Sequence, residues 1–372
     1  MTAAGIFNLV VGAGFGLGFA FGLIAARTNF CTMGALSDVV NMGHWGRVRM
    51  WMLAVAVAVL GASWLSYTGQ VDLARSVTQR PNLPWLSLLV GGLCFGVGMT
   101  LAGGCVNKNL IRLGGGSLRS LVVLAFLAIA AYMTLKGLFG QWRASLLDPV
   151  RIDLAALGWP DQSLGTALAR ATGMARGPAL LATAGAVALV LLVLVFRDAR
   201  FRSRIEQVLG AIALGVLVVV AWYVSGHLGY GENPETLETV YFATNTRTIE
   251  SLSFVAPAAY SLELLMLWTD ASLHLSFGIA SAIGVVAGSA VHALASRQFR
   301  LEGFASIEDL RSQIVGAVLM GFGGITALGC TIGQGMSGLS TLAIGSFIAV
   351  AGIVGGCVAT LRYTLWREER AG

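Results

Sequence analysis

Cysteines raise the first question about chemistry in this chain. Five occur, and three of them share a setting. Cys31 lies in "ARTNFCTMGAL", where an apolar segment turns polar, while Cys105 and Cys330 each follow a glycine at the end of an apolar segment. Cys94 and Cys357 instead lie inside apolar runs, where a free cysteine usually packs as a small hydrophobic residue. The first three are therefore candidate functional thiols, and the last two are interpreted as packing residues.

The turns around Cys105 and Cys330 have the composition of an anion-binding site. Gly104 and Gly329 precede the two cysteines and allow the backbone to approach a ligand closely. A helix that starts after such a turn offers free backbone N–H groups and the positive end of its dipole. A neutral thiol is a weak, polarizable donor that costs less to bury than a charge. These turns suit a small anion carrying a soft sulfur atom, with further donors from Asn107, Asn109, Thr331, Gln334 and Ser337.

Other classes of thiol chemistry fit the spacing less well. The cysteines form no CxxC or zinc-type pattern and the four histidines are scattered, so the sequence predicts neither a metal site nor a cofactor. A membrane thiol oxidoreductase that passes electrons to a quinone stays open, although it would need a reactive cysteine pair. A soft-metal ion transporter also stays open, because Met33 and Met336 lie near the candidate cysteines.

The composition indicates what must position these turns. Of 372 residues, 56% are hydrophobic and only 11% are charged, which predicts an all-α polytopic membrane protein rather than an enzyme of the cytosol. We expect about 9–10 transmembrane segments, and the two that end at Cys105 and Cys330 are expected to be short half-helices reaching the middle of the membrane. The segments are 9–27, 48–67, 86–103, 119–139, 177–196, 206–225, 254–269, 273–295, 313–329 and 341–361.

Loop charges give an orientation. Residues 197–204, "RDARFRSR", carry four arginines and are placed in the cytoplasm, whereas the acidic loop 229–253 is placed outside or is merely polar. The same rule accounts for the net charge of +6 without a nucleic-acid partner. The positions of Lys108, Arg112 and Arg119 have two equally good explanations: the positive-inside rule, or a basic entrance that attracts anions to a transport pathway.

An internal repeat appears when the two cysteine turns are aligned. "GGLCFGVGMTLAGGC" and "GAVLMGFGGITALGC" each lead into a polar turn and a glycine-serine approach to the next segment. We predict a first transmembrane repeat over 1–140, a connector over 141–205 with one intervening span and the basic cytoplasmic loop, and a second repeat over 206–372. One intervening span would invert the second repeat, a pattern typical of transporters with a site at the repeat interface. The alternative is a pair of glycine-rich packing helices without a pathway.

Residues outside the turns receive structural interpretations. Tryptophans that flank spans, such as Trp45, Trp51, Trp142 and Trp366, are interpreted as membrane-interface residues. Glu263 and Asp270 could supply a coupling carboxylate, but a place near the membrane interface is favoured for both.

Three motifs resemble the YeeE/YedE family of sulfur-compound membrane transporters. They are "RTNFCTMGALSD", "LAGGCVNKNLIRLGGGSLRSL" and "FRLEGFASIEDLRSQIVGAVLMGFGGITALGCTIGQGMSGLSTLA". The resemblance implies an inverted-repeat helical fold, a location in the bacterial inner membrane, and import of thiosulfate or a related small sulfur anion. It also implies that Cys31, Cys105 and Cys330 pass the ion along by transient S–H···S contacts. Some members act beside a cytoplasmic TusA-like sulfur carrier protein, so such a carrier is an expected partner besides membrane lipid.

Overall fold

The computed structural model describes residues 2–232, 237–304 and 306–371, and nearly all of its regular structure is helical. Within these residues, eight helical segments are long and apolar enough to cross a membrane, and a ninth apolar helix is shorter. The protein is therefore an all-α, multi-pass membrane protein, as the composition predicts.

Each of the ten predicted segments is a helix in the structure. Most contain a broad apolar surface with glycine and alanine at the helix contacts, the composition expected where helices pack closely in lipid. These helices are α1 (Ala3–Thr28), α3 (Gly46–Tyr67), α4 (Trp85–Leu101), α6 (Leu118–Lys136), α9 (Arg176–Phe196), α11 (Ile205–Tyr223), α12 (Val255–Met266), α13 (Phe277–Ala295), α14 (Ile307–Thr326) and α15 (Ile344–Ala371).

Shorter elements connect these helices. The helical ones are α2 (Thr32–Met42), α5 (Val106–Gly114), α7 (Leu138–Trp142), α8 (Leu164–Thr172), α10 (Ala199–Arg202), η1 (Leu73–Arg75), η2 (Val77–Gln79), η3 (Arg143–Leu147), η4 (Val224–Leu228) and η5 (Gly333–Gly338). Two small antiparallel pairs of strands join β1 (Asn82–Leu83) to β2 (Ile152–Asp153) and β3 (Tyr230–Glu232) to β4 (Thr239–Tyr241).

Close helix contacts at glycine build the core. In α1, a Cβ atom placed on Gly18 would overlap the carbonyl oxygen of Ser281 in α13, so only glycine lets these two helices touch at this point. Gly22 meets Val285 four residues further along both helices, which shows that α1 and α13 run in parallel. The two helices form one of the largest helix contacts in the protein.

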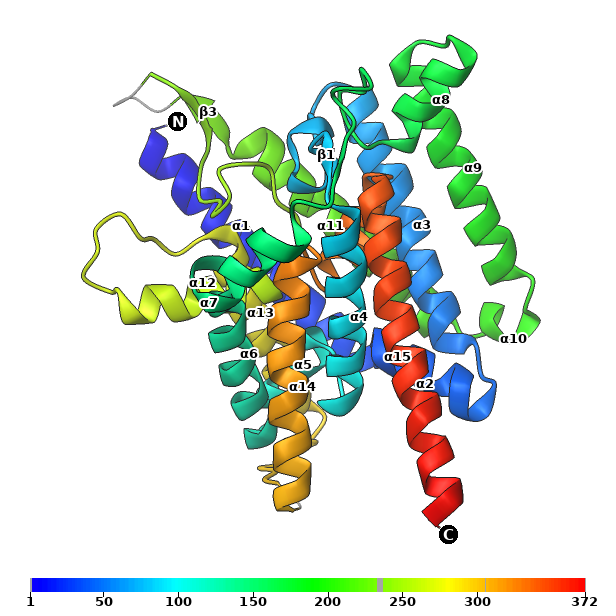
Figure 1. The fold of residues 1–372 in the computed structure, drawn as a ribbon, viewed down its shortest axis with the longest axis vertical. Coiled ribbons are helices and arrows are strands. Elements are labelled where there is room, and N and C mark those ends of the chain that lie inside the picture. The colour runs from blue at the N-terminus through cyan, green and yellow to red at the C-terminus, as the bar shows by residue number, and fades with distance from the viewer. Residues whose placement is uncertain (1, 233–236, 305, 372) are drawn as a thin grey trace.

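Helices α4 and α14 run antiparallel through the middle of the molecule (Figure 1). Gly91 of α4 faces Ala327, just past the end of α14, while Gly98 near the end of α4 faces Met320. Each helix therefore ends beside the middle of the other, inside the protein. The short segments α5 and η5 follow these ends and carry the chain through the centre.

The packing pattern is the one that two related halves would give. Helix α4 packs on α15 as α14 packs on α6, and α1 packs on α13 as α3 packs on α11. The repeat boundaries themselves, 1–140 and 206–372, stay a prediction.

The connector between the halves lies beside the bundle. Its helix α9 packs on α3 and α8, and buried Asp161 before α8 forms an ion pair with Arg176 at the start of α9. The basic loop 197–204 precedes α11 and the strands β3 and β4 follow it, so the loop and the strand pair lie at opposite ends of one spanning helix. This arrangement agrees with the opposite sides predicted for them.

Candidate functional site

Each of the three candidate cysteines lies at the start of a short helical segment. Helix α1 ends at Asn29, which has a left-handed backbone (φ 53°), and the chain is extended at Cys31 before α2 begins. After α4, Gly103 adopts φ 65° and Cys105 is the residue before α5. Cys330 follows the end of α14 by four residues and precedes η5. The local pattern is the same three times: an apolar helix ends, the chain reverses, and a cysteine begins the next segment.

At each turn a backbone N–H three residues further on faces the sulfur. The N–H of Gly34 donates to Cys31 Sγ at 3.3 Å, and the N–H of Gly333 donates to Cys330 Sγ at 3.4 Å. The N–H of Lys108 also lies near the thiol of Cys105, but Cys105 makes no capping hydrogen bond to α5. Because the sulfurs of Cys31 and Cys330 accept a hydrogen bond from the backbone, their own S–H protons remain able to donate to another atom.

The three thiols gather in the buried centre of the protein. Cys31 is 5% exposed, and Cys105 and Cys330 are fully buried. The thiols of Cys31 and Cys105 lie side by side, and the Cys105 thiol also lies near Cys330 and the hydroxyl of Thr331. Cys105 therefore stands in the middle of the three. All five cysteines are free thiols in the structure.

The predicted amide side chains divide into two roles. Asn109 is buried and its Nδ2 donates to the carbonyl oxygens of Gly104 and Cys105, at 3.1 and 3.2 Å, so it holds the turn together. Asn107 is also buried, but among the described residues neither its Oδ1 nor its Nδ2 has a hydrogen-bond partner. A buried amide without partners is costly, so Asn107 is available to a ligand in a way that Asn109 is not.

The second turn has the same division. Gln334 donates from Nε2 to the carbonyl oxygen of Ala327 at 2.7 Å, while its Oε1 has no partner within the described chain. Ser337 donates to the carbonyl oxygen of Leu252 at 2.8 Å and so connects η5 to the segment before α12. Gly329 precedes Cys330, and a Cβ atom at this position would lie only 3.1 Å from the backbone nitrogen of Gln334, so a side chain would fit tightly here.

Two residues beside the cysteine turns, Thr32 and Trp51, were not predicted from the sequence. Thr32, next to Cys31, has a buried hydroxyl, and Trp51 has a buried indole N–H; neither finds a partner in the described part of the chain. The ring of Trp51 lies against Gly335 of η5, so the interpretation of Trp51 as a membrane-interface residue is wrong. Trp45, Trp142 and Trp366 are exposed, as expected. Trp51 is the sixth residue of a spanning helix, and this position in the sequence could have indicated that it lies inside the bundle.

Lys108 brings a positive charge close to the thiols. Its ammonium donates to Asn29 Oδ1 at 2.7 Å, and the nearest ionisable groups include Cys31, Cys105 and Arg112. Arg112 donates to the carbonyl oxygen of Gly103 at 2.9 Å. Arg119 has a different role, because it forms an ion pair with Asp309 across the contact of α6 with α14. Of the three basic residues discussed from the sequence, Lys108 is thus the one whose charge faces the thiols.

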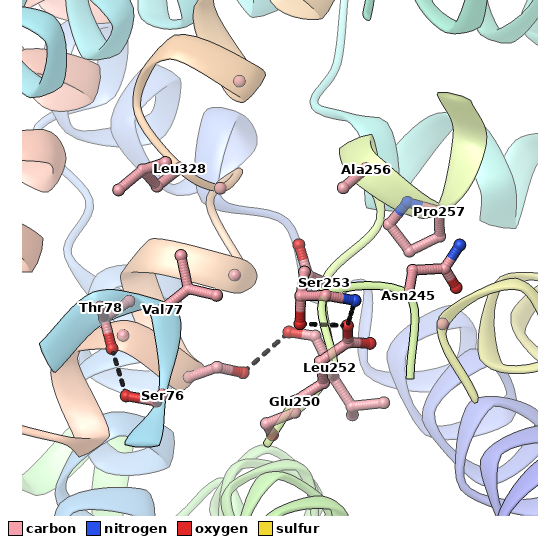
Figure 2. Close-up of a pocket in the computed structure, with 18 of the residues that line it drawn as sticks. Ser76, Val77, Thr78, Asn245, Glu250, Leu252, Ser253, Ala256, Pro257 and Leu328 are labelled. Carbon is pink, nitrogen blue, oxygen red and sulfur yellow. Dashed lines mark hydrogen bonds between the residues drawn. The ribbon is translucent and has the colours of Figure 1, made fainter. Parts of the chain in front are cut away.

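A cavity of about 280 Å³ reaches the second cysteine turn from the side of the segment between β4 and α12. Figure 2 shows the turn of Ser76–Thr78 and Leu328 on one side of it, and the segment with Glu250, Ser253 and Pro257 on the other. Gly329 and Gly333, which flank Cys330, form part of its wall. The first residues of α12 and Gly278 of α13 also line it, so the positive ends of two helix dipoles face this space.

The other two cysteines occupy packing positions. Cys357 is fully buried in α15 and its sulfur accepts a hydrogen bond from the hydroxyl of Thr100 in α4, at 3.3 Å. Cys94 lies on α4 and is partly exposed. Neither begins a helical segment, which agrees with the interpretation from the sequence.

The spanning helices break at buried turns that contain glycine, and these turns meet in a centre of polar donors. This combination is typical of a membrane transport protein. The chain belongs to the sulphur transport family, whose model matches residues 27–359. It is 24% identical over 362 residues to the thiosulfate transporter TsuA of Escherichia coli, covering 89% of this chain and 88% of that protein. It is also 24% identical over 344 residues to the thiosulfate transporter TsuA of Spirochaeta thermophila, covering 90% and 92%. The family and these relatives are transporters and not enzymes.

Proposed function

We propose that this protein imports thiosulfate, or a related small sulfur-containing anion, across the bacterial inner membrane. The observation that carries the proposal is the meeting of three buried thiols at the starts of short helical segments, two of them with a backbone N–H donating to the sulfur. The relatives named as thiosulfate transporters support the choice of substrate.

The anion would first enter the cavity beside the segment between β4 and α12. Its negative charge is attracted by the starts of α12 and α13, and the cavity wall at Gly329 and Gly333 brings it beside Cys330. A sulfur anion loses part of its hydration here, and the neutral polar groups of the wall replace some of the lost hydrogen bonds. The loop 229–253 would therefore lie outside the cell, as its charge predicts.

The thiols would then pass the anion inward in the order Cys330, Cys105 and Cys31. We choose this order because the Cys105 thiol lies beside that of Cys31 and also near Cys330. Each S–H can donate to the terminal sulfur of the anion, and the sulfurs of Cys31 and Cys330 can keep their backbone hydrogen bonds as they do so. Because such contacts are weak, the ion is not trapped at one position, and no covalent bond forms or breaks.

Unpartnered donors near the thiols would stabilise the oxygen atoms of the anion during this passage. Asn107 Nδ2, Thr32 Oγ1 and Trp51 Nε1 can each donate a hydrogen bond that they do not make within the described protein. Beyond Cys31, the ammonium of Lys108 would attract the anion toward the cytoplasm. A TusA-like sulfur carrier protein in the cytoplasm could accept the anion beyond Lys108. This partner is proposed from the family resemblance alone.

Growth on thiosulfate as the sole sulfur source tests the proposal. A bacterium that lacks thiosulfate uptake is given the wild-type protein, Cys105→Ala, or the control Cys357→Ala, at equal membrane expression. We expect rescue by the wild type and by Cys357→Ala, and loss of rescue with Cys105→Ala. Rescue by all three proteins would contradict the thiol relay but would still support thiosulfate import. Rescue by none would contradict thiosulfate import, and metal-dependent binding to the thiols would then favour a soft-metal transporter.

A further inference from the structure

Glu250 is an acidic side chain in the wall of a cavity that the proposed function assigns to an anion. It lies on the segment between β4 and α12 and lines the same space as Ser253 and Pro257 (Figure 2). An ionised carboxylate at this place would repel a dianion within the same small cavity. The protonation state of Glu250 therefore decides whether the cavity favours or opposes the substrate.

The carboxyl group is held firmly in this position. Glu250 Oε1 accepts hydrogen bonds from the backbone N–H of Thr246 at 2.9 Å and from its hydroxyl at 2.7 Å. The hydroxyl of Thr248 lies 2.8 Å from that of Thr246. The backbone of Glu250 is fixed to Ser225, which accepts from its N–H at 3.2 Å and donates to its carbonyl oxygen. Such a carboxyl cannot simply swing away when an anion arrives.

No cation balances Glu250 within the described residues. None of the ion pairs there includes it, and Arg143, the one basic residue in the cavity wall, is paired with Asp148 at 3.1 Å. The other titratable group that faces Glu250 is the phenol of Tyr260 on α12. Burial raises the pKa of the Glu250 carboxyl above its ordinary value, although the hydrogen bonds from Thr246 oppose this shift.

We propose that Glu250 binds a proton together with the anion in the outer cavity, so that substrate binding is coupled to protonation of this residue. The inference rests on the proposed function. The neutral carboxyl removes the repulsion and presents an O–H that can donate to an oxygen of the anion. Coupling is reciprocal, so a bound anion must in turn favour the proton on Glu250.

The coupling has a definite sign and slope. Below the pKa of Glu250 the carboxyl is already neutral and the affinity for the anion does not depend on pH. Above it, a proton must be taken up for each anion bound, so the apparent affinity falls toward a limit of about tenfold per pH unit. Thiosulfate stays fully ionised over this range and contributes no titration of its own.

The test measures thiosulfate uptake into proteoliposomes as the outer pH is varied from acidic to mildly alkaline. For the wild type we expect the KM for thiosulfate to rise with pH once the carboxyl ionises. Glu250→Gln, which is neutral at every pH, should give a KM that does not change with pH. Glu232→Gln on β3, an exposed acid of the same outer region, is the matched control and should behave as the wild type.

A second variant and a second readout guard against a folding defect. Thr246→Val removes the hydroxyl that stabilises the ionised carboxylate, so the rise in KM should begin at a higher pH. Sodium thiosulfate added to the purified protein in weakly buffered solution should make the wild type, but not Glu250→Gln, take up protons. Two results would overturn this inference alone: the wild type takes up thiosulfate with a KM that does not change with pH, or Glu250→Gln shows the same pH dependence of KM as the wild type. Absence of uptake by the wild type at every pH would overturn the proposed function and this inference with it.

Discussion

The thiols of Cys31 and Cys105 lie side by side although they come from the starts of two different helices, α2 and α5. They meet because α1 and α4 both end inside the bundle and reverse at a cysteine. If the ion passes from one thiol to the next in series, each thiol is needed for the same passage. The effects of removing them then cannot be independent.

We therefore expect the double variant Cys31→Ala/Cys105→Ala to transport no more slowly than the slower of the two single variants. Each single change should reduce thiosulfate uptake by about tenfold or more, which corresponds to one lost hydrogen bond of roughly 1.5 kcal/mol. Initial rates of uptake into membrane vesicles at equal expression measure this. Effects that multiply in the double variant would contradict passage in series, because they would show that the two thiols contribute independently to one step.

The charge of Lys108, rather than its hydrogen bond to Asn29, is expected to matter for transport. Lys108→Met keeps the length of the side chain and removes the ammonium beside Cys31 and Cys105, so uptake should fall several-fold. Lys108→Arg keeps the charge and should recover most of the rate. Uptake assays at low and high salt provide the measurement; equal rates for the methionine variant and the wild type would remove Lys108 from the pathway.

Asn107 and Asn109 are two positions apart on α5, but changing them should have opposite consequences. Asn109 makes two hydrogen bonds to its own turn, so Asn109→Ala should lower thermal stability, by about 1–2 kcal/mol in unfolding free energy. The side chain of Asn107 makes no hydrogen bond to the described residues. Asn107→Ala should therefore leave stability nearly unchanged but slow thiosulfate uptake. Melting temperature and transport rate are measured on the same preparations. A large loss of stability in Asn107→Ala would make this residue part of the scaffold instead.

The sequence predicted the ten helices and the shared setting of Cys31, Cys105 and Cys330, because apolar length and the change from apolar to polar residues at a cysteine are local signals. It did not predict which polar groups lack partners. The contrast between Asn107 and Asn109 depends on how α5 is turned toward the bundle, and nothing in "NKN" encodes that directly.

The sequence also failed to predict site residues that come from segments distant in the chain, for a related reason. Trp51 approaches η5 only because α3 passes beside it, and Glu250 enters the cavity wall through the fold of the loop before α12. In the sequence, these two residues look like an interface tryptophan and one more acid in an acidic loop. Their surroundings are a product of tertiary packing and have no short-range pattern.

Packing of α1 on α13 should depend on glycine at position 18 and not on glycine in general. In Gly18→Ala the new methyl group would overlap the backbone of Ser281, so the helices must separate, at a cost of about 1–3 kcal/mol. Gly16→Ala on the same helix meets open space and is the matched control. Thermal unfolding in detergent, followed by the loss of monodisperse protein, compares the two. Equal melting temperatures would show that this helix contact is looser than the structure indicates.

Glu263 is buried on α12 and is paired with Lys136 at the end of α6, and this pair is expected to serve stability rather than transport. Lys136→Ala leaves the carboxylate without its cation, so unfolding should become easier by about 1 kcal/mol, the modest value reflecting the half-exposed lysine. Glu263→Gln removes the charge that needs balancing, so the double variant Lys136→Ala/Glu263→Gln should recover most of the lost stability. Melting temperatures of the three variants measure the cycle, and thiosulfate uptake by Glu263→Gln should stay near that of the wild type. Loss of uptake in a well-folded Glu263→Gln protein would instead make this carboxylate the coupling group.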